Sequence, residues 1–187
     1  HYLAMKLFGD NEWADHASRA GEVPIANLNV KSIQSNSDNL QINWLGHSTF
    51  LLQWKGVNIL TDPIFADRAS PLSFAGPLRY IPHVTDYKNL PPIDYVIISH
   101  NHYDYLDKTA VHLLGNTPVY LVPLKLKAWF LENGISSGRI KELDWWDTAT
   151  FTNVAFKALP SQHWSARSLF DRRKTLWASW RINLKGV

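Results

Sequence analysis

The sequence predicts a mixed α/β domain, with a mixed sheet and helices on one face. Three observations support this prediction. An antiparallel start over residues 40–62 is followed by a strand–helix–strand–helix alternation over residues 94–134, a pattern typical of a sheet covered by its own connecting helices. The composition, with 45% apolar and 19% charged residues, is that of a globular chain. At 187 residues the chain is long enough for one domain with a sizeable core.

The antiparallel start consists of three short segments. "LQINW" (40–44) alternates apolar and polar residues, which predicts a strand. "STFLLQW" (48–54) and "VNILTD" (57–62) flank Lys55-Gly56, so we expect a tight hairpin turn there. Residues 63–93 hold six of the ten prolines and predict a long irregular connection. A loop of that length inside a compact domain is often functional.

Two strand and helix pairs follow the long connection. "DYVIIS" (94–99) has an apolar, β-branched centre, which fits a buried strand. Asp107 can cap a helix over "KTAVHLL". "VYLV" (119–122) is the next predicted strand, and we expect the second helix to run from Pro123 to Gly134.

The last third of the chain predicts further strands. Residues 148–160 favour two short strands, and residues 175–184 favour another. "INLKGV" (182–187) repeats the strand and Lys-Gly pattern of the first hairpin without a return strand, so we expect the chain to stop where another strand should begin. We therefore divide it into an N-terminal arm (1–38) and a domain (39–187) truncated before its second half.

Composition excludes several kinds of site. The chain has no cysteine, so disulfides and thiolate zinc sites are excluded and any metal must be held by His and Asp or Glu. The net charge of +3 allows an anionic substrate but does not argue for nucleic acid. No run of about 18 apolar residues is present. The sequence leaves the location open between the cytoplasm and a peripheral membrane position.

The segment "SHNHYDYLD" (99–107) is the main candidate for chemistry. If it continues the preceding strand, His100, His102 and Asp104 point to one side, whereas Asn101 and Tyr103 point to the other. Two imidazoles two residues apart can share one zinc ion, and the carboxylate can take a second metal. Such a metal lowers the pKa of bound water to about 7 and gives hydroxide. The alternative is a polar loop with helix-capping aspartates, and we expect Asp107 to be only a cap.

Three other residues could complete or support this site. His163, in "LPSQHWSARS", follows another predicted strand and is the candidate third ligand. His47, in "WLGHSTFLL", is a ligand, a residue that supports a ligand, or a turn residue. Asp62, in "LTDPIF", could orient a ligand histidine through its free N–H, or it could simply form an Asp-Pro turn.

The basic segment "RSLFDRRK" (167–174) has two interpretations. Its cations could steer a phosphate group. A solvated loop is the interpretation that we favour, and this includes Arg167.

At these residues the sequence resembles the metallo-β-lactamase superfamily. Within it, the similarity is to the branch of N-acylphosphatidylethanolamine-hydrolysing phospholipase D. The matching stretches include "WLGHSTFLL", "ILTDPIFADRASPLSFAGPLRY", "LPPIDYVIISHNHYDYLD" and "LPSQHWSARSLFDRRKTLWASW". The resemblance implies an αββα sandwich with a two-zinc site at one edge. It also implies hydrolysis of a phosphodiester or related ester bond by metal-bound hydroxide.

The resemblance also implies roles for individual residues. His100, His102 and His163 match the ligands of one zinc ion, and Asp104 matches a catalytic ligand of the other. The family motif continues with a histidine where this chain has Tyr105. A phenol, with a pKa near 10, is a poor zinc ligand at neutral pH.

The resemblance extends to only part of the family's domain. The family has a bridging aspartate and a further histidine downstream of the last matched segment, and this sequence ends before them. We therefore expect an exposed apolar sheet face, covered by the missing C-terminal half or by a second copy in a homo-oligomer.

Three hypotheses follow. The first is a metal-dependent hydrolase of a small-molecule or lipid phosphodiester, complete only with the missing half. The second is a truncated chain that binds one metal without turnover. The third is a non-catalytic interaction module, whose aromatic residues and basic loop form a membrane or partner surface. Imidazole ligands favour one or two zinc ions, although Mn or Fe also suits a His and Asp set.

Overall fold

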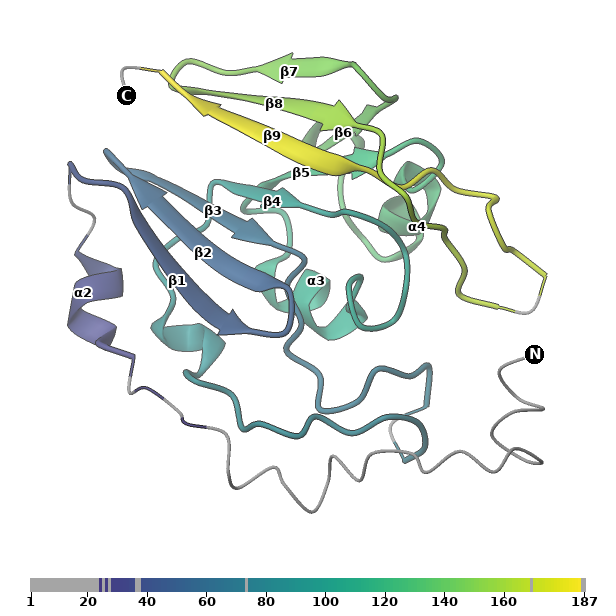
Figure 1. The fold of residues 1–187 in the computed structure, drawn as a ribbon, viewed down its shortest axis with the longest axis horizontal. Coiled ribbons are helices and arrows are strands. Elements are labelled where there is room, and N and C mark those ends of the chain that lie inside the picture. The colour runs from purple at the N-terminus through teal and green to yellow at the C-terminus, as the bar shows by residue number, and fades with distance from the viewer. Residues whose placement is uncertain are drawn as a thin grey trace.

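The computed structural model contains two β-sheets packed face to face, with helices on the outer face of the larger sheet (Figure 1). It describes residues 24, 26, 28–35, 38–72, 74–168 and 170–185. Most of the proposed arm (1–38) lies outside these residues, as does the end of the Lys-Gly turn predicted near the C-terminus. The arm boundary stays a prediction, although Ile33 of the arm is fully buried in the core.

The larger sheet has six strands in chain order. They are β1 (Gln41–Gly46), β2 (Thr49–Trp54), β3 (Val57–Thr61), β4 (Tyr95–Ile97), β5 (Val119–Pro123) and β6 (Ile140–Leu143). Strands β1 to β3 pair antiparallel, and strands β3 to β6 pair parallel. The predicted mixed sheet is therefore confirmed.

The predicted hairpin joins β2 to β3. Trp54 pairs with Val57, which leaves a two-residue loop. Lys55 and Gly56 both have positive φ, 43° and 82°. Such a turn matches the right-handed twist of the strands, and glycine at its second position avoids strain.

Short helices cover one face of the larger sheet. They are α2 (Val30–Gln34), α3 (Lys108–Leu114) and α4 (Lys127–Glu132), with 3₁₀ turns η2 (Tyr87–Asn89) and η3 (Ser137–Arg139). Ile33, Val111 and Phe130, one from each α-helix, share a core cluster with Leu60 and Val96 of the sheet. Helices on one face of a mixed sheet are what the sequence predicted.

The predicted start of the second helix at Pro123 is wrong. Pro123 is the last residue of β5, where it pairs with Leu143 of β6. The N–H of Leu124 then donates to the Leu143 carbonyl, so strand pairing continues past the proline. The helix begins only at Lys127, because the strand partner overrides the local preference of proline for a helix start.

The smaller sheet contains β7 (Thr148–Thr150), β8 (Val154–Leu159) and β9 (Ser179–Leu184), all antiparallel. The two strands predicted over 148–160 are confirmed, and β9 occupies only the second half of the segment predicted at 175–184. Alternate residues of β8, such as Phe156, are buried against Ile97 and Leu121 of the larger sheet. The two sheets therefore share a second apolar core.

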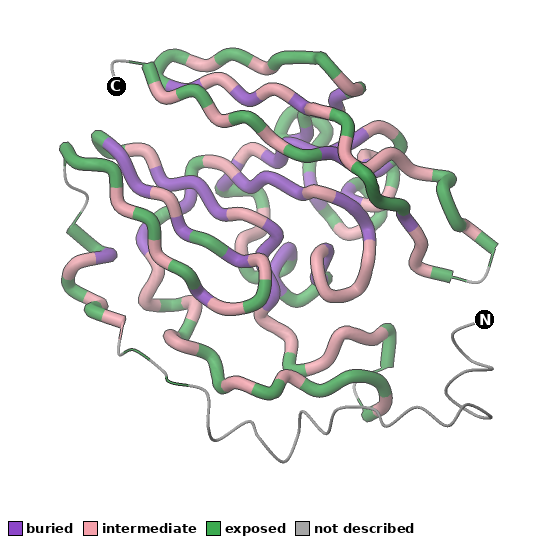
Figure 2. Tube along the Cα trace, viewed as in Figure 1, coloured by how far each residue is buried: buried purple, intermediate pink, exposed green. Residues whose placement is uncertain are grey.

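Part of the larger sheet's inner face is uncovered. Ile42 and Trp44 of β1 and Phe50 of β2 are 59%, 53% and 37% exposed. Strand register places these residues on the same face as Ile59, which is buried between the sheets. Figure 2 shows the resulting exposed positions along β1. This confirms the expected exposed apolar surface.

Candidate metal centre

Three histidines from two distant segments meet at one point. His100 and His102 follow β4, and His163 follows β8. The Nε2 of His100 lies 2.8 Å from the Nδ1 of His102 and 3.0 Å from the Nε2 of His163. One ring nitrogen from each of the three lies within 4.8 Å of the others. The structure therefore brings together the three residues predicted to hold one metal ion.

The rings meet nearly edge to face. The interplanar angle is 86° between His100 and His102, and 81° between His100 and His163. His100 is buried and His163 is exposed. The cluster is therefore buried on the side of His100 and accessible to solvent on the side of His163.

The surroundings of His100 and His102 favour the neutral imidazole, which is the form that binds a metal ion. Burial, together with repulsion from His102 and His163, lowers the pKa of His100 to about 3. Burial also lowers the pKa of His102, with His163 adding to the effect. A neutral imidazole offers the lone pair that a metal ion needs. Among the described residues, the buried Nε2 of His102 has no hydrogen-bond partner, whereas its Nδ1 lies 2.8 Å from His100 Nε2.

Asp62 is connected to this cluster through Ser99, which contacts both Asp62 and His100. The backbone N–H of Ser99 donates to Asp62 Oδ1 at 2.7 Å, and Ser99 Oγ lies 2.8 Å from His100 Nδ1. Asp62 is buried and has a φ of 35°. Burial raises its pKa to about 7, against the lowering effect of the Ser99 hydrogen bonds. The structure thus places Ser99, which sequence analysis did not single out, between the carboxylate and the histidine.

Asp104 and His47 form a separate pair beside the cluster. The Nε2 of His47 lies 3.2 Å from Asp104 Oδ2. Burial raises the pKa of Asp104, but the hydrogen bond with His47, a backbone hydrogen bond and the nearby His47 and His102 together outweigh burial, so the pKa is lowered. The backbone of His47 has a φ of 47°, and the Trp44 indole N–H donates to its carbonyl at 2.8 Å.

Tyr105 occupies the space between this pair and the histidine cluster. Its ring centroid is 5.0 Å from that of His47 and 4.2 Å from that of His100. Tyr105, at the sequence position where the resemblance leads us to expect a histidine, therefore contacts both groups of side chains.

Asp107 does more than the predicted cap. Its carboxylate accepts hydrogen bonds from Thr109 and Ala110 at the start of α3. It also accepts hydrogen bonds of 2.8 and 2.9 Å from the backbone N–H groups of Phe65 and Ala66. The expectation of a cap alone is wrong, because Asp107 also ties the long connection to the histidine-bearing loop.

Arg167 is also placed differently from the expectation. Its Nη1 donates to the carbonyls of Asn101 and Leu106, so this side chain does not belong to a solvated loop. The other three cations of the segment are exposed as expected, namely Arg172, Arg173 and Lys174.

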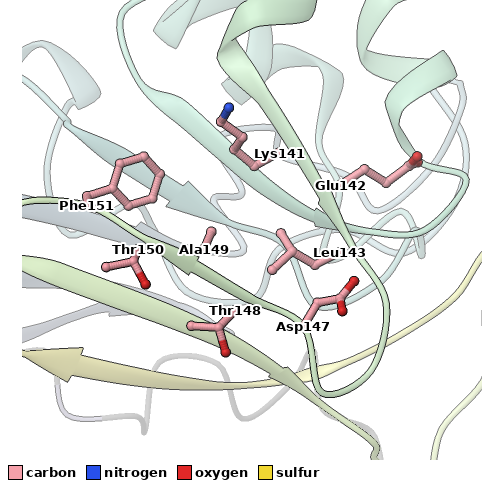
Figure 3. A pocket seen from close by; sticks show the side chains of 8 residues that line it. All are labelled: Lys141, Glu142, Leu143, Asp147, Thr148, Ala149, Thr150 and Phe151. Carbon is pink, nitrogen blue, oxygen red and sulfur yellow. The ribbon is translucent and has the colours of Figure 1, made fainter.

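Two hollows lie outside the cluster. One, of about 690 Å³, lies behind the histidine-bearing loop and is lined by Tyr103, Trp129 and Arg167 among others. Tyr103 thus lines a space to which the three histidines do not contribute. The other, of about 460 Å³, lies between β6 and β7 (Figure 3). Its carboxylates, Glu142 and Asp147, accept backbone N–H bonds, and nothing there indicates a ligand.

Comparison with known proteins identifies the family. A sequence profile of the Beta-lactamase superfamily domain matches residues 57–187. The chain belongs to the beta-lactamase superfamily. The predicted superfamily is confirmed, and relatives of this superfamily member are named as hydrolases.

The curated relatives refine the similarity. The superfamily member is 38% identical over 170 residues to N-acyl-phosphatidylethanolamine-hydrolyzing phospholipase D 1 of Caenorhabditis elegans, covering 86% of this chain and 48% of the relative. It is 41% identical over 167 residues to an uncharacterized protein of Mycobacterium tuberculosis, covering 88% and 44%. The mitochondrial phospholipase D of the same name from Saccharomyces cerevisiae is 33% identical, with 76% and 31% covered. The chain spans half or less of the length of these relatives.

Solved structures support the fold alone. Igni18, a metallo hydrolase from Ignicoccus hospitalis, superposes with a TM-score of 0.56 at 17% identity, covering 79% of this chain and 57% of that one. CmlA, a diiron beta-hydroxylase from Streptomyces venezuelae, gives a TM-score of 0.52 at 20% identity, covering 81% and 28%. The predicted sandwich architecture agrees with both.

Proposed function

We propose that this chain supplies the metal-binding part of a hydrolase that cleaves phosphodiester or related ester bonds in a lipid or other small molecule. The observation that carries the proposal is the convergence of His100, His102 and His163, with ring nitrogens within 4.8 Å. Two relatives are named for the hydrolysis of N-acyl-phosphatidylethanolamine, which supports a lipid substrate class.

The three imidazoles fit a divalent metal ion. Zinc is favoured by an all-imidazole set, and Mn or Fe is the alternative once a carboxylate takes part. When bound, the metal would supply an activated water for hydrolysis near neutral pH. The exposed side of the cluster, at His163, is where substrate would approach.

The chain's own residues would support that chemistry. Ser99, held by Asp62, fixes the Nδ1 side of the His100 ring and directs Nε2 toward the other two histidines. The contact with His47 favours the ionised form of Asp104, so this carboxylate is suited to bind a cation. Because Tyr105 replaces an imidazole beside this pair, we propose one metal ion rather than two.

A membrane-bound substrate is supported by the surface near this site. Leu72 and Phe170 are 48% and 82% exposed on two loops that also contribute to the hollow behind the histidines. Arg172 and Lys174 are exposed next to Phe170. Apolar tips beside cations are typical of peripheral contact with an anionic lipid surface. Among the helices of the described residues, none is long and apolar enough to span a bilayer.

A metal-binding chain without turnover is the second candidate, favoured by Tyr105, because its phenol is a poor ligand for a second metal beside Asp104 and His47. The test is hydrolysis of bis(p-nitrophenyl) phosphate by the zinc-loaded chain, beside His163→Ala. Hydrolysis that depends on metal and is lost in His163→Ala would support the enzyme. Stoichiometric metal without hydrolysis would support the second candidate. Absence of bound metal would refute both the hydrolase and the metal-binding chain without turnover, and would favour a non-catalytic interaction module.

A further inference from the structure

The three histidines of the proposed metal site come from two segments, and these segments must keep a fixed position relative to each other. His100 and His163 are 63 positions apart, and each lies in a loop beyond the end of its strand. A loop holds a side chain less firmly than a strand does. Some contact between the two loops is therefore needed to keep the ring nitrogens at one point.

Arg167 makes such a contact. It lies four residues after His163, and its Nη1 donates to the carbonyls of Asn101 at 2.9 Å and Leu106 at 2.7 Å. These two carbonyls bracket His102. The turn between them is closed by a 2.8 Å bond from the Leu106 N–H to the His102 carbonyl. The Arg167 side chain therefore forms hydrogen bonds to both ends of the turn that contains His102.

Two aromatic rings also contact the guanidinium group. Its central carbon lies 4.0 Å from the ring centroid of Tyr103 and 5.2 Å from that of Trp129. The backbone of Arg167 is fixed as well, because its N–H donates to both carboxylate oxygens of Asp171. A planar group with several donors, stacked on aromatic rings, cannot be replaced by the single ammonium of lysine.

These contacts distinguish Arg167 from the phosphate-steering cation considered for its segment. Nη1 is already committed to two carbonyl oxygens, and burial lowers the pKa of the guanidinium. The neighbouring Arg173 is exposed instead.

We propose that Arg167 is a positioning residue, which clamps the His102 turn to the His163 segment and so sets the affinity of the metal site. The inference rests on the proposed metal site. Residues that orient metal ligands typically change metal affinity by about 10- to 100-fold when mutated. We expect a loss of that size in Arg167→Lys, with Arg173→Lys as the matched control on the same segment.

The test is a titration of the metal-free chain with Co²⁺, whose visible spectrum reports both affinity and coordination geometry. Wild type and Arg173→Lys should bind equally, and Arg167→Lys should bind about 10- to 100-fold more weakly with an altered spectrum. Circular dichroism and thermal unfolding without metal establish that each variant is folded. A folded Arg167→Lys that matches Arg173→Lys in affinity and spectrum overturns the inference.

Chemical rescue provides a second measurement. Arg167 lines the open hollow of about 690 Å³, so a small cation can enter where its side chain is removed. In Arg167→Ala, millimolar guanidinium should restore Co²⁺ affinity, whereas ammonium at the same ionic strength should not. Equal effects of the two salts would count against the clamp. Absence of Co²⁺ binding in wild type would refute the proposed metal site, and the proposed role of Arg167 would be refuted with it. Co²⁺ binding in wild type with unchanged binding in Arg167→Lys would refute only the role of Arg167.

Discussion

The backbone N–H of Ser99 donates a 2.7 Å hydrogen bond to the buried carboxylate of Asp62, which makes no direct hydrogen bond to any histidine in the part of the chain that the structure describes. This relationship connects the end of β3 to the residue that precedes His100. Asp62, which has a strained φ of 35°, can therefore affect the orientation of the His100 ring through Ser99.

Asp62→Asn should change how stability depends on pH. Burial raises the pKa of Asp62 from 3.8 to about 7, so the folded protein holds a proton that the unfolded chain releases within this range. In metal-free wild type, this carboxyl makes the free energy of unfolding fall as pH rises from about 4 to about 7. Asp62→Asn should lack that contribution. Urea unfolding at several pH values checks it, and identical slopes for both proteins would contradict the account.

Asp107→Ala should destabilise the fold strongly. The carboxylate accepts four backbone N–H bonds, two from α3 and two from the long connection. Removing it leaves buried donors without partners, so we expect a loss of about 2–4 kcal/mol in the free energy of unfolding. Asp86→Ala is the control, since Asp86 caps only the exposed turn η2 and should cost about 1 kcal/mol or less. Equal losses in the two variants would refute the dual role.

Tyr105→His should favour a second metal ion. The Tyr105 ring lies between His47 and His100, next to the Asp104 carboxylate that His47 holds. An imidazole there would add a ligand that a phenol does not provide at neutral pH. We expect the zinc content to rise above that of wild type in equilibrium dialysis, whereas Tyr105→Phe should match wild type. An unchanged content in Tyr105→His would show that this position does not limit the second metal.

The exposed inner face should make the isolated chain associate with itself. Trp44 and Phe50 form a cross-strand apolar pair on that face, and both are exposed. We expect self-association in sedimentation velocity together with binding of a hydrophobic dye. Trp44→Ser with Phe50→Ser should reduce both, and Leu113→Ser, on an exposed position of α3, should not. A monomer that binds no dye would contradict this expectation.

The side-chain directions around the histidine motif were predictable from sequence because they depend on local geometry. His100 and His102 lie in a loop beyond β4, which ends at Ile97, and both meet His163 as the expected alternation placed them, whereas Asp104 pairs with His47 instead. Tyr103 lines the hollow behind the loop, which agrees with the expected direction, although this residue lies in a turn and not in the strand.

Other features depend on distant partners and were not predictable. Arg167 bonds to carbonyls 66 and 61 positions away, and a backbone carbonyl carries no sequence pattern. The same holds for Asp107, whose second pair of donors lies in an irregular connection. Pro123 misled the helix prediction for a related reason, because its pairing with Leu143 decides its conformation.

The central claim is that His100, His102 and His163 together hold one divalent metal ion. Zinc titration of the metal-free chain by calorimetry tests it most directly, with single alanine variants of the three histidines and His83→Ala as the control outside the cluster. We predict one tight site in wild type and in His83→Ala, and its loss in each of the three variants. Absence of binding in wild type, or alanine variants that bind as tightly as His83→Ala, would contradict the claim.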